Sequence, residues 1–161
     1  FYTFAPMNKA LLIASLLFFK FTGSGIAQIG IGLGSHGLNV RTNPDSKHGL
    51  IIRTGFGFTA DPFETFFRPE AAWIKRHHYS DKTKLYAGLG AAGEVIFSVS
   101  ELHLAYGFII PVGLELFPLE NKRLSVSLET GLSFLDIGQT DSQFGNYGLL
   151  EITFYLDHHH D

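Results

Sequence analysis

The sequence predicts an all-β protein, an antiparallel up-and-down β-barrel, from three observations. Apolar and polar residues alternate in segment after segment between residues 29 and 156. Clusters of Gly, Asn, Asp, Ser and Pro separate these segments at short intervals, as turns do. No helical period of useful length occurs after residue 28. Because a strand sends successive side chains to opposite faces, each segment has one apolar and one polar face.

The composition limits the classes of function. The 161 residues are enough for one domain, with a net charge of -3 and no basic run, which disfavours nucleic acid as a partner. There is no cysteine, so disulfide and thiolate chemistry are excluded. The 18 Gly and 16 Phe favour close strand contacts and an aromatic-rich apolar surface. No cofactor is expected.

The N-terminal segment is typical of an export signal. Met7-Asn8-Lys9 forms a short basic region, and residues 10–19 form an apolar stretch too short to span a bilayer comfortably. Small residues before Gln28 suit cleavage at that point, although a buried amphipathic helix is the alternative. The expected organisation is a signal peptide with a short extension at 1–27, a β-barrel domain at 28–156 and a His-rich tail at 157–161.

Seven strands can be placed from the pattern. They cover residues 29–41, 50–59, 65–78, 85–92, 106–116, 124–134 and 147–156. Closed bacterial barrels have an even number of strands, which points to eight. The eighth could lie in residues 95–103, or the Gly-rich first segment could be two short strands. That segment changes phase near Ser35-His36, where a bulge is expected. Pro69 within a strand suggests an edge or a bulge.

The two faces differ in a way that favours a transmembrane barrel. One face carries Leu, Ile, Val and Phe, whereas the other carries Gly, Ala, Ser and Thr with isolated charges. These predicted interior charges are Arg53, Arg68, Glu70, Glu115, Glu129 and Glu151. Small residues suit a narrow interior, and charges there must pair because unpaired charges are strongly unfavourable in a dry core. The alternative is a soluble lipocalin-like barrel whose apolar face lines a ligand cavity.

Aromatic residues cluster near the strand ends. Trp73, Tyr106, Phe134, Tyr147 and Phe154 are predicted to form girdles at the membrane interface. Ordinary aromatics of a β-core would produce a similar pattern.

Four stretches carry a resemblance to a known family: IGIGLGSHG, PVGLELFP, LSVSLETGLSF and the terminal GLLEITFYL. With the signal segment, they resemble small outer-membrane barrels of the OmpA/OmpX-like superfamily, in a Bacteroidetes-type version. The resemblance implies an eight-stranded barrel in the outer membrane of a Gram-negative bacterium. We expect a monomer, although the sequence leaves the oligomeric state open. It implies contacts with outer-membrane lipid, lipopolysaccharide and the barrel-assembly machinery, with Phe154, Tyr155 and Leu156 as the assembly signal.

If the C-terminus lies in the periplasm, the side of the membrane on which each connection lies follows from the strand order. Residues 119–122 and 77–82 become short periplasmic turns. Residues 136–146 and 95–103 become longer outer loops, which matches the usual asymmetry of these barrels.

Few residues suggest catalysis or metal binding. Ser98, Ser100, Glu101 and His103 form one local cluster that could supply a nucleophile, an acid and a base, although a polar loop is the favoured interpretation. The DHHHD tail at 157–161 could bind a divalent metal, but a solvated tail is favoured. We therefore expect a non-enzymatic envelope or surface role through the outer loops, with a lipid-modifying barrel enzyme as an alternative.

Two further motifs have structural interpretations. His77 and His78, beside Lys75 and Arg76, are interpreted as a solvated basic turn. The alternating glycines of Gly30–Gly34 are not a nucleotide loop, because no helix follows them.

Overall fold

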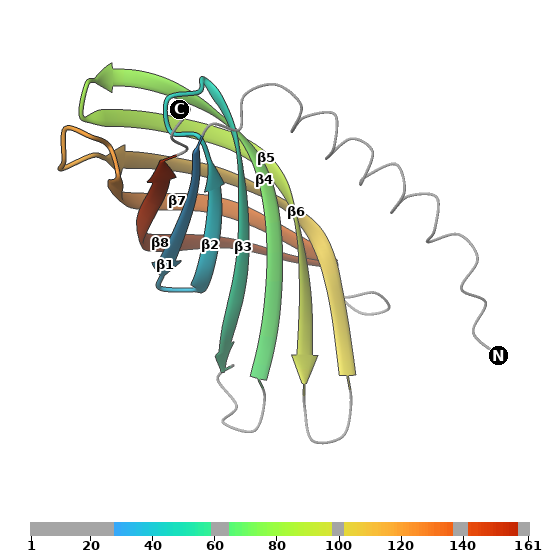
Figure 1. Ribbon diagram of the computed structural model, residues 1–161. Coiled ribbons are helices and arrows are strands. Elements are labelled where there is room, and N and C mark those ends of the chain that lie inside the picture. Colours follow the sequence, from blue (N-terminus) through green and yellow to red (C-terminus); the bar gives the residue numbers. More distant parts are fainter. Residues whose placement is uncertain (1–27, 59–64, 98–101, 137–141, 158–161) are drawn as a thin grey trace, which may run out of the picture.

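A computed structural model describes residues 28–58, 65–97, 102–136 and 142–157, which form a single ring of strands (Figure 1). Each strand pairs antiparallel with the next, and β1 pairs with β8 to close an eight-stranded up-and-down barrel. The strands are β1 (Gln28–Gly34), β2 (Gly37–Thr42), β3 (His48–Phe58), β4 (Thr65–Ser80), β5 (Thr83–Phe97), β6 (Leu102–Leu116), β7 (Leu124–Asp136) and β8 (Ser142–Asp157). Within the described residues, no helix is long and apolar enough to cross a membrane.

The eighth strand comes from the Gly-rich first segment, which is a hairpin of β1 and β2. Gly34 pairs with Gly37 across a turn of Ser35 and His36, so the expected bulge at this point is wrong. A two-residue turn places an odd-numbered residue opposite an even-numbered one, which produces the same phase change as a bulge. Gly37 has φ 127 and lies against the carbonyl of Thr54, so a side chain there would be strained and crowded.

The strands run further than the sequence pattern predicted. Residues 95–97 continue β5, residues 102–103 begin β6, and β8 already begins at Ser142. The expected long outer loops at 95–103 and 136–146 are therefore wrong for most of their length. Polar residues such as Gln143 suggested a loop, yet Gln143 pairs with Leu135 of β7.

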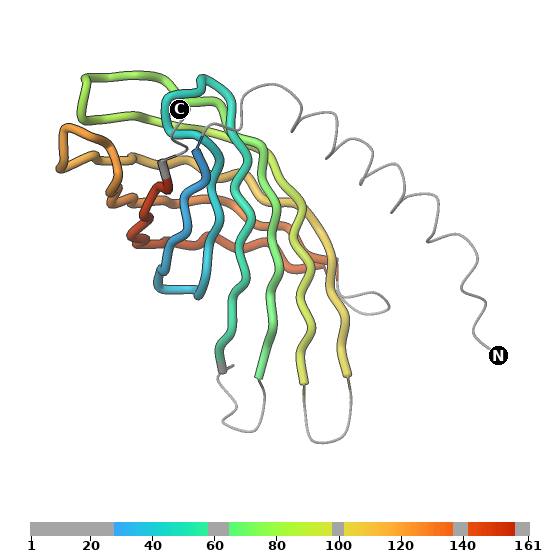
Figure 2. Tube along the Cα trace, viewed as in Figure 1, coloured from blue at the N-terminus to red at the C-terminus, as the bar shows by residue number. Residues whose placement is uncertain are grey.

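The barrel wall is uneven in height. β1 and β2 have 7 and 6 residues, whereas β4 and β8 have 16 each. The trace in Figure 2 shows β3 to β6 extending well past the β1–β2 turn. We call the end where β1 begins and β8 ends the terminal end; the turns 43–47, 81–82 and 117–123 lie there. The opposite end is the loop end.

The apolar face of each strand lies outside. Leu128 is 62% exposed and Leu150 is 55% exposed, whereas Glu129 and Glu151 beside them are buried. Among strand residues whose side chains are described, the outward-facing charged ones are Lys75 near the terminal end and Asp136 at the loop end.

Two prolines lie inside strands of this closed ring. Pro69 of β4 and Pro111 of β6 both fall where pairing with β5 is interrupted. Since a barrel has no edge strand, these interruptions accommodate the missing proline N–H groups.

Glycine makes room for large inward side chains. A Cβ at Gly113 would lie 2.7 Å from Cε1 of Tyr86, whose hydroxyl is fixed by a 2.6 Å hydrogen bond to Glu129. We expect Gly113→Ala to lower the free energy of unfolding by about 1–3 kcal/mol, because the ring cannot move without losing that bond. Urea unfolding in detergent measures this.

Gly148→Ala is the matched control. A Cβ at Gly148 would meet nothing closer than 3.9 Å, and the residue is exposed on the outer face. Equal stability of the two variants would contradict the proposed packing role of Gly113.

Candidate functional site: the ion-pair column

Eight inward side chains form a continuous chain of alternating charge through the barrel, which we call the ion-pair column. From the terminal end to the loop end, the column consists of Arg76, Glu115, Arg41, Glu151, Arg53, Glu70, Arg68 and Glu94. Its members come from β2, β3, β4, β5, β6 and β8, so it joins strands on all sides of the ring.

Arg53 is the centre of the column. Its Nε lies 3.0 Å from Oε1 of Glu151, and its Nη1 lies 3.4 Å from Oε2 of Glu70. Its Nη2 also donates to Glu129, a branch from the main column. Arg53 is only 4% exposed, so these three carboxylates replace its hydration.

The terminal half of the column is the most deeply buried. Arg41 donates to Glu151, and its Nη1 lies 3.8 Å from Oε1 of Glu115. The Nε of Arg76 lies 3.4 Å from the other oxygen of Glu115. Both Arg41 and Glu115 are 0% exposed, so a lone charge at either position would lack solvent as well as a partner.

The loop half is more open. The Nε of Arg68 lies 2.8 Å from Oε1 of Glu70, and its Nη1 lies 3.6 Å from Oε2 of Glu94. The side chains of Arg68 and Glu94 are 14% and 18% exposed, so the column approaches solvent at this end.

Tyrosine and serine hydroxyls donate further hydrogen bonds to two of the carboxylates, those of Glu129 and Glu115. The hydroxyls of Tyr86 and Tyr147 donate to Glu129 at 2.6 and 3.0 Å. Tyr155 and Ser125 donate to Oε1 of Glu115 at 2.6 and 3.1 Å. Hydrogen bonds to ionised groups are stronger than neutral ones, so these hydroxyls help to fix the positions of the two carboxylates inside the barrel.

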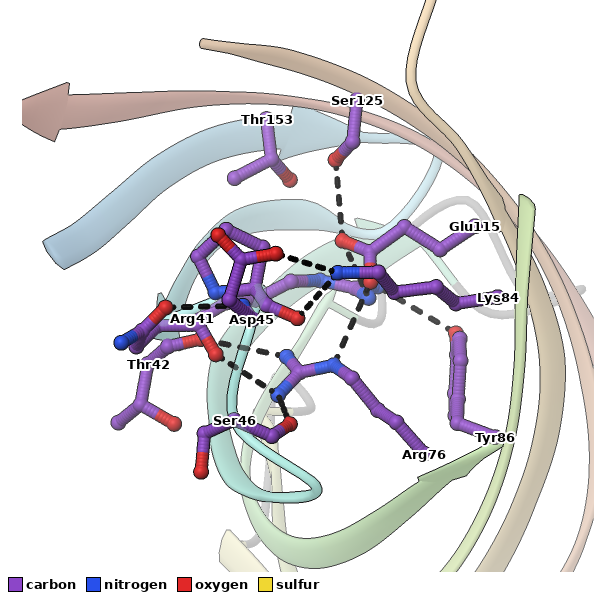
Figure 3. A network of polar contacts seen from close by, with 12 residues as sticks. Arg41, Thr42, Asp45, Ser46, Arg76, Lys84, Tyr86, Glu115, Ser125 and Thr153 are labelled. Atoms are coloured by element: carbon purple, nitrogen blue, oxygen red, sulfur yellow. Dashed lines mark hydrogen bonds and ion pairs between the residues drawn. The ribbon is translucent and has the colours of Figure 1, made fainter. Parts of the chain in front are cut away.

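The turn between β2 and β3 closes the terminal end of the interior (Figure 3). Arg76 holds it by donating to the carbonyl oxygens of Thr42, Asn43 and Ser46 at 3.2, 3.1 and 3.4 Å. Pro44, within this turn, is buried. We call residues 42–47 the turn plug, because they lie over Arg76 and cover the opening of the barrel at the terminal end (Figure 3).

Two lysines, one on β5 and one in the β6–β7 turn, hold the turn plug in place. Lys84 donates from Nζ to the carbonyl oxygen of Pro44 at 2.6 Å and to Oδ1 of Asp45 at 3.1 Å. Lys122, from the β6–β7 turn, donates to the same carboxylate oxygen at 2.7 Å. Partial burial would raise the pKa of Asp45, but the hydrogen bonds from Lys122 and Lys84 outweigh it and hold that pKa below its usual value.

The structure brings together all six charges that the sequence placed in the interior. Arg53, Arg68, Glu70, Glu115 and Glu151 belong to the column, and Glu129 branches from Arg53. The sequence analysis missed further inward polar residues, which are Arg41, Arg76, Lys84, Glu94, Tyr86, Tyr147 and Tyr155. Arg76 lies within the predicted strand 65–78 in the phase of Glu70, and Lys84 directly precedes the predicted strand 85–92, so following the inward phase to the end of each strand would have found both.

The predicted interface aromatics divide into two groups. Trp73, Tyr106 and Phe154 are exposed on the outer face, at 44%, 67% and 60%, and Phe134 stacks on Phe108 there. Tyr147 is wrongly assigned, because its hydroxyl bonds to Glu129 inside the barrel. An aromatic residue near a strand end faces lipid only if it lies at one of the alternate positions that point out of the barrel.

The predicted assembly signal also has mixed orientation. Phe154 and Leu156 are exposed outside, whereas Tyr155 is 3% exposed and points to Glu115.

Several other candidates fall outside the described residues. These are the signal segment 1–27, the Ser98–Glu101 part of the suggested catalytic cluster, and residues 158–161 of the His-rich tail. His103 lies in β6 and is exposed. Among the residues that the structure describes, no group of three His, Asp or Glu side chains is placed to hold a metal ion.

Comparison with known proteins gives a match in fold. No protein-family model matches the chain, and no curated protein matches it in sequence. The crystal structure of Ail, the attachment invasion locus protein of Yersinia pestis, aligns with a TM-score of 0.51 and 13% sequence identity. The alignment covers 80% of this chain and 94% of that one. At this identity the likeness concerns the fold, an eight-stranded antiparallel barrel.

The column predicts strong coupling between Arg53 and Glu129. Arg53→Met leaves buried carboxylates without their cation and should cost about 3–5 kcal/mol of unfolding free energy. Glu129→Gln should also destabilise the barrel, but it keeps an acceptor for the tyrosines. The double variant should cost less than the sum of the two singles, by roughly 1–3 kcal/mol.

A double-mutant cycle by urea unfolding in detergent tests this coupling. Additive effects would contradict a direct ion pair, and two near-neutral single variants would contradict the whole column.

Proposed function

We propose that this chain is an integral outer-membrane β-barrel of a Gram-negative bacterium, with a non-enzymatic role in the envelope or in contacts at the cell surface. The observation that carries the proposal is the inverted distribution of polarity. The ion-pair column occupies the interior, while Leu, Ile, Val and Phe are exposed around the wall. In water such a surface would associate, but in a bilayer it is solvated by lipid.

The dimensions support this setting. The 13 residues of β7, at about 3.3 Å per residue and a tilt of about 40°, rise roughly 30 Å, compared with an apolar band of about 25 Å in known barrels. The outward charges Lys75 and Asp136 lie near opposite ends of the barrel, so the wall between them is free of charge over the described strands. Closure of the ring also satisfies the strand-to-strand hydrogen bonds that lipid cannot supply.

A lipocalin-like carrier fits poorly. It would need an apolar cavity, whereas this interior holds ion pairs and two small apolar clusters, one of Ile51, Ile74 and Tyr86 and one around Ile109. A diffusion pore fits poorly as well, because the column fills the centre and the turn plug closes one end.

The loop end is the part suited to contacts outside the cell. With the terminal end in the periplasm, the loop end faces the outside of the cell. At this end β3 to β6 extend well past the short β1–β2 hairpin (Figure 1). The structurally similar Ail is named as an attachment invasion locus protein, which supports a surface-interaction role here.

Fractionation tests the proposal. Expressed with residues 1–27 in a Gram-negative host, the protein should be recovered in the outer membrane. Its band on a denaturing gel should shift between unboiled and boiled samples, because a closed barrel resists detergent until heated. Recovery in the soluble periplasm, with no shift, would refute membrane insertion and would favour a soluble carrier.

A further inference from the structure

A basic and aromatic patch lies on the outer wall near the terminal end. It consists of His48 on β3 and Trp73, Lys75 and His77 on β4, and we call it the headgroup patch. His48 pairs directly with Lys75 in the sheet, and its ring stacks on Trp73 with centroids 5.1 Å apart and planes inclined by 15°. Lys75 and His77 follow on the same face of β4, and both are exposed.

The protein leaves the positive charge of this patch uncompensated. Within the described residues, Lys75, His48 and His77 form no ion pair with a carboxylate. The nearby Asp45 is bound by Lys84 and Lys122 across the mouth of the barrel. The ammonium group of Lys75 is therefore available to an anion from outside the protein.

The wall beside the patch suits an acyl chain. Towards the loop end, the next outward positions on β4 and β5 are Ala71 and Ala91, which pair with each other. Trp73 of the patch pairs with Leu89 in the row between these alanines and Lys75. Both alanines are exposed and have small side chains, so an acyl chain can lie close to the backbone of the wall there, next to the indole of Trp73. Cations and Trp next to an apolar surface are typical of the membrane–water interface.

We propose that the headgroup patch binds the phosphate of an anionic phospholipid in the leaflet at the terminal end, with an acyl chain lying over Ala71 and Ala91. Lys75 supplies the fixed positive charge, His48 and His77 supply ring N–H donors, and Trp73 packs against the glycerol region. This inference rests on the proposed membrane insertion and adds a lipid preference to it.

Trp73 is the single tryptophan of the chain, which makes the site directly observable. The folded protein is reconstituted in vesicles of phosphatidylcholine and phosphatidylglycerol, and one lipid at a time carries dibrominated acyl chains that quench nearby tryptophan. Brominated phosphatidylglycerol should quench Trp73 in excess of its mole fraction, corresponding to a relative affinity of about fivefold.

Variants separate the patch from general charge effects. Lys75→Gln should remove most of the preference, and Lys75→Arg should retain it. Lys82→Gln, which removes the same charge from the exposed β4–β5 turn, should leave it unchanged. Equal quenching by both brominated lipids in the unchanged protein would overturn the headgroup patch, while insertion would stand. Absence of quenching by either lipid would instead refute membrane insertion itself.

Discussion

The arginine at the centre of this barrel sets the conditions for the rest of the structure. Arg53 is removed from water, and only the carboxylates of Glu70, Glu129 and Glu151 replace its hydration. Each carboxylate needs further donors, which Arg41, Arg68 and the tyrosines supply. A buried ion pair is weak as a source of net stability, but breaking one is costly. The column therefore favours one register of the eight strands, because a slip by one residue would move charges to the outer face.

Space and closure follow from the same constraint. Long inward side chains fit a narrow ring only where a neighbour is small, which accounts for Gly113 beside Tyr86 and Gly131 beside Tyr147. At the terminal end, the Nε of Arg76 lies near Glu115, and its two Nη groups donate to backbone carbonyl oxygens. These carbonyl oxygens belong to the turn plug, so the same hydrogen bonds close the barrel and satisfy the buried donors of Arg76.

The sequence was sufficient for the fold class and for the direction in which most strand residues point. Strict alternation made the phase of Arg53, Glu129 and Glu151 readable without a structure. The limits of strands were harder, because Ser142 and Gln143 are polar residues that pair in the sheet all the same. The β1–β2 turn was mistaken for a bulge since both change the phase by one residue.

The sequence predicted the middle of the ion-pair column but not its terminal end. Arg76 and Tyr147 lie inside the predicted strands 65–78 and 147–156, but they were interpreted as turn and interface residues because the inward phase was not followed to the strand ends. Lys84 was missed because the predicted strand began one residue later. The turn plug could not be predicted, since the contacts that hold it join residues 30 to 77 positions apart, most of them through backbone carbonyls. Such contacts leave no periodic signal in one sequence.

The central claim is that the alternating strands turn their apolar side to lipid. The chain has no cysteine, so a single Leu128→Cys substitution gives a unique spin-label site midway along β7. In reconstituted vesicles, the label should collide often with oxygen, which dissolves in lipid, and rarely with a water-soluble nickel chelate. Frequent collision with the nickel chelate and little with oxygen would place that face in water and contradict the account.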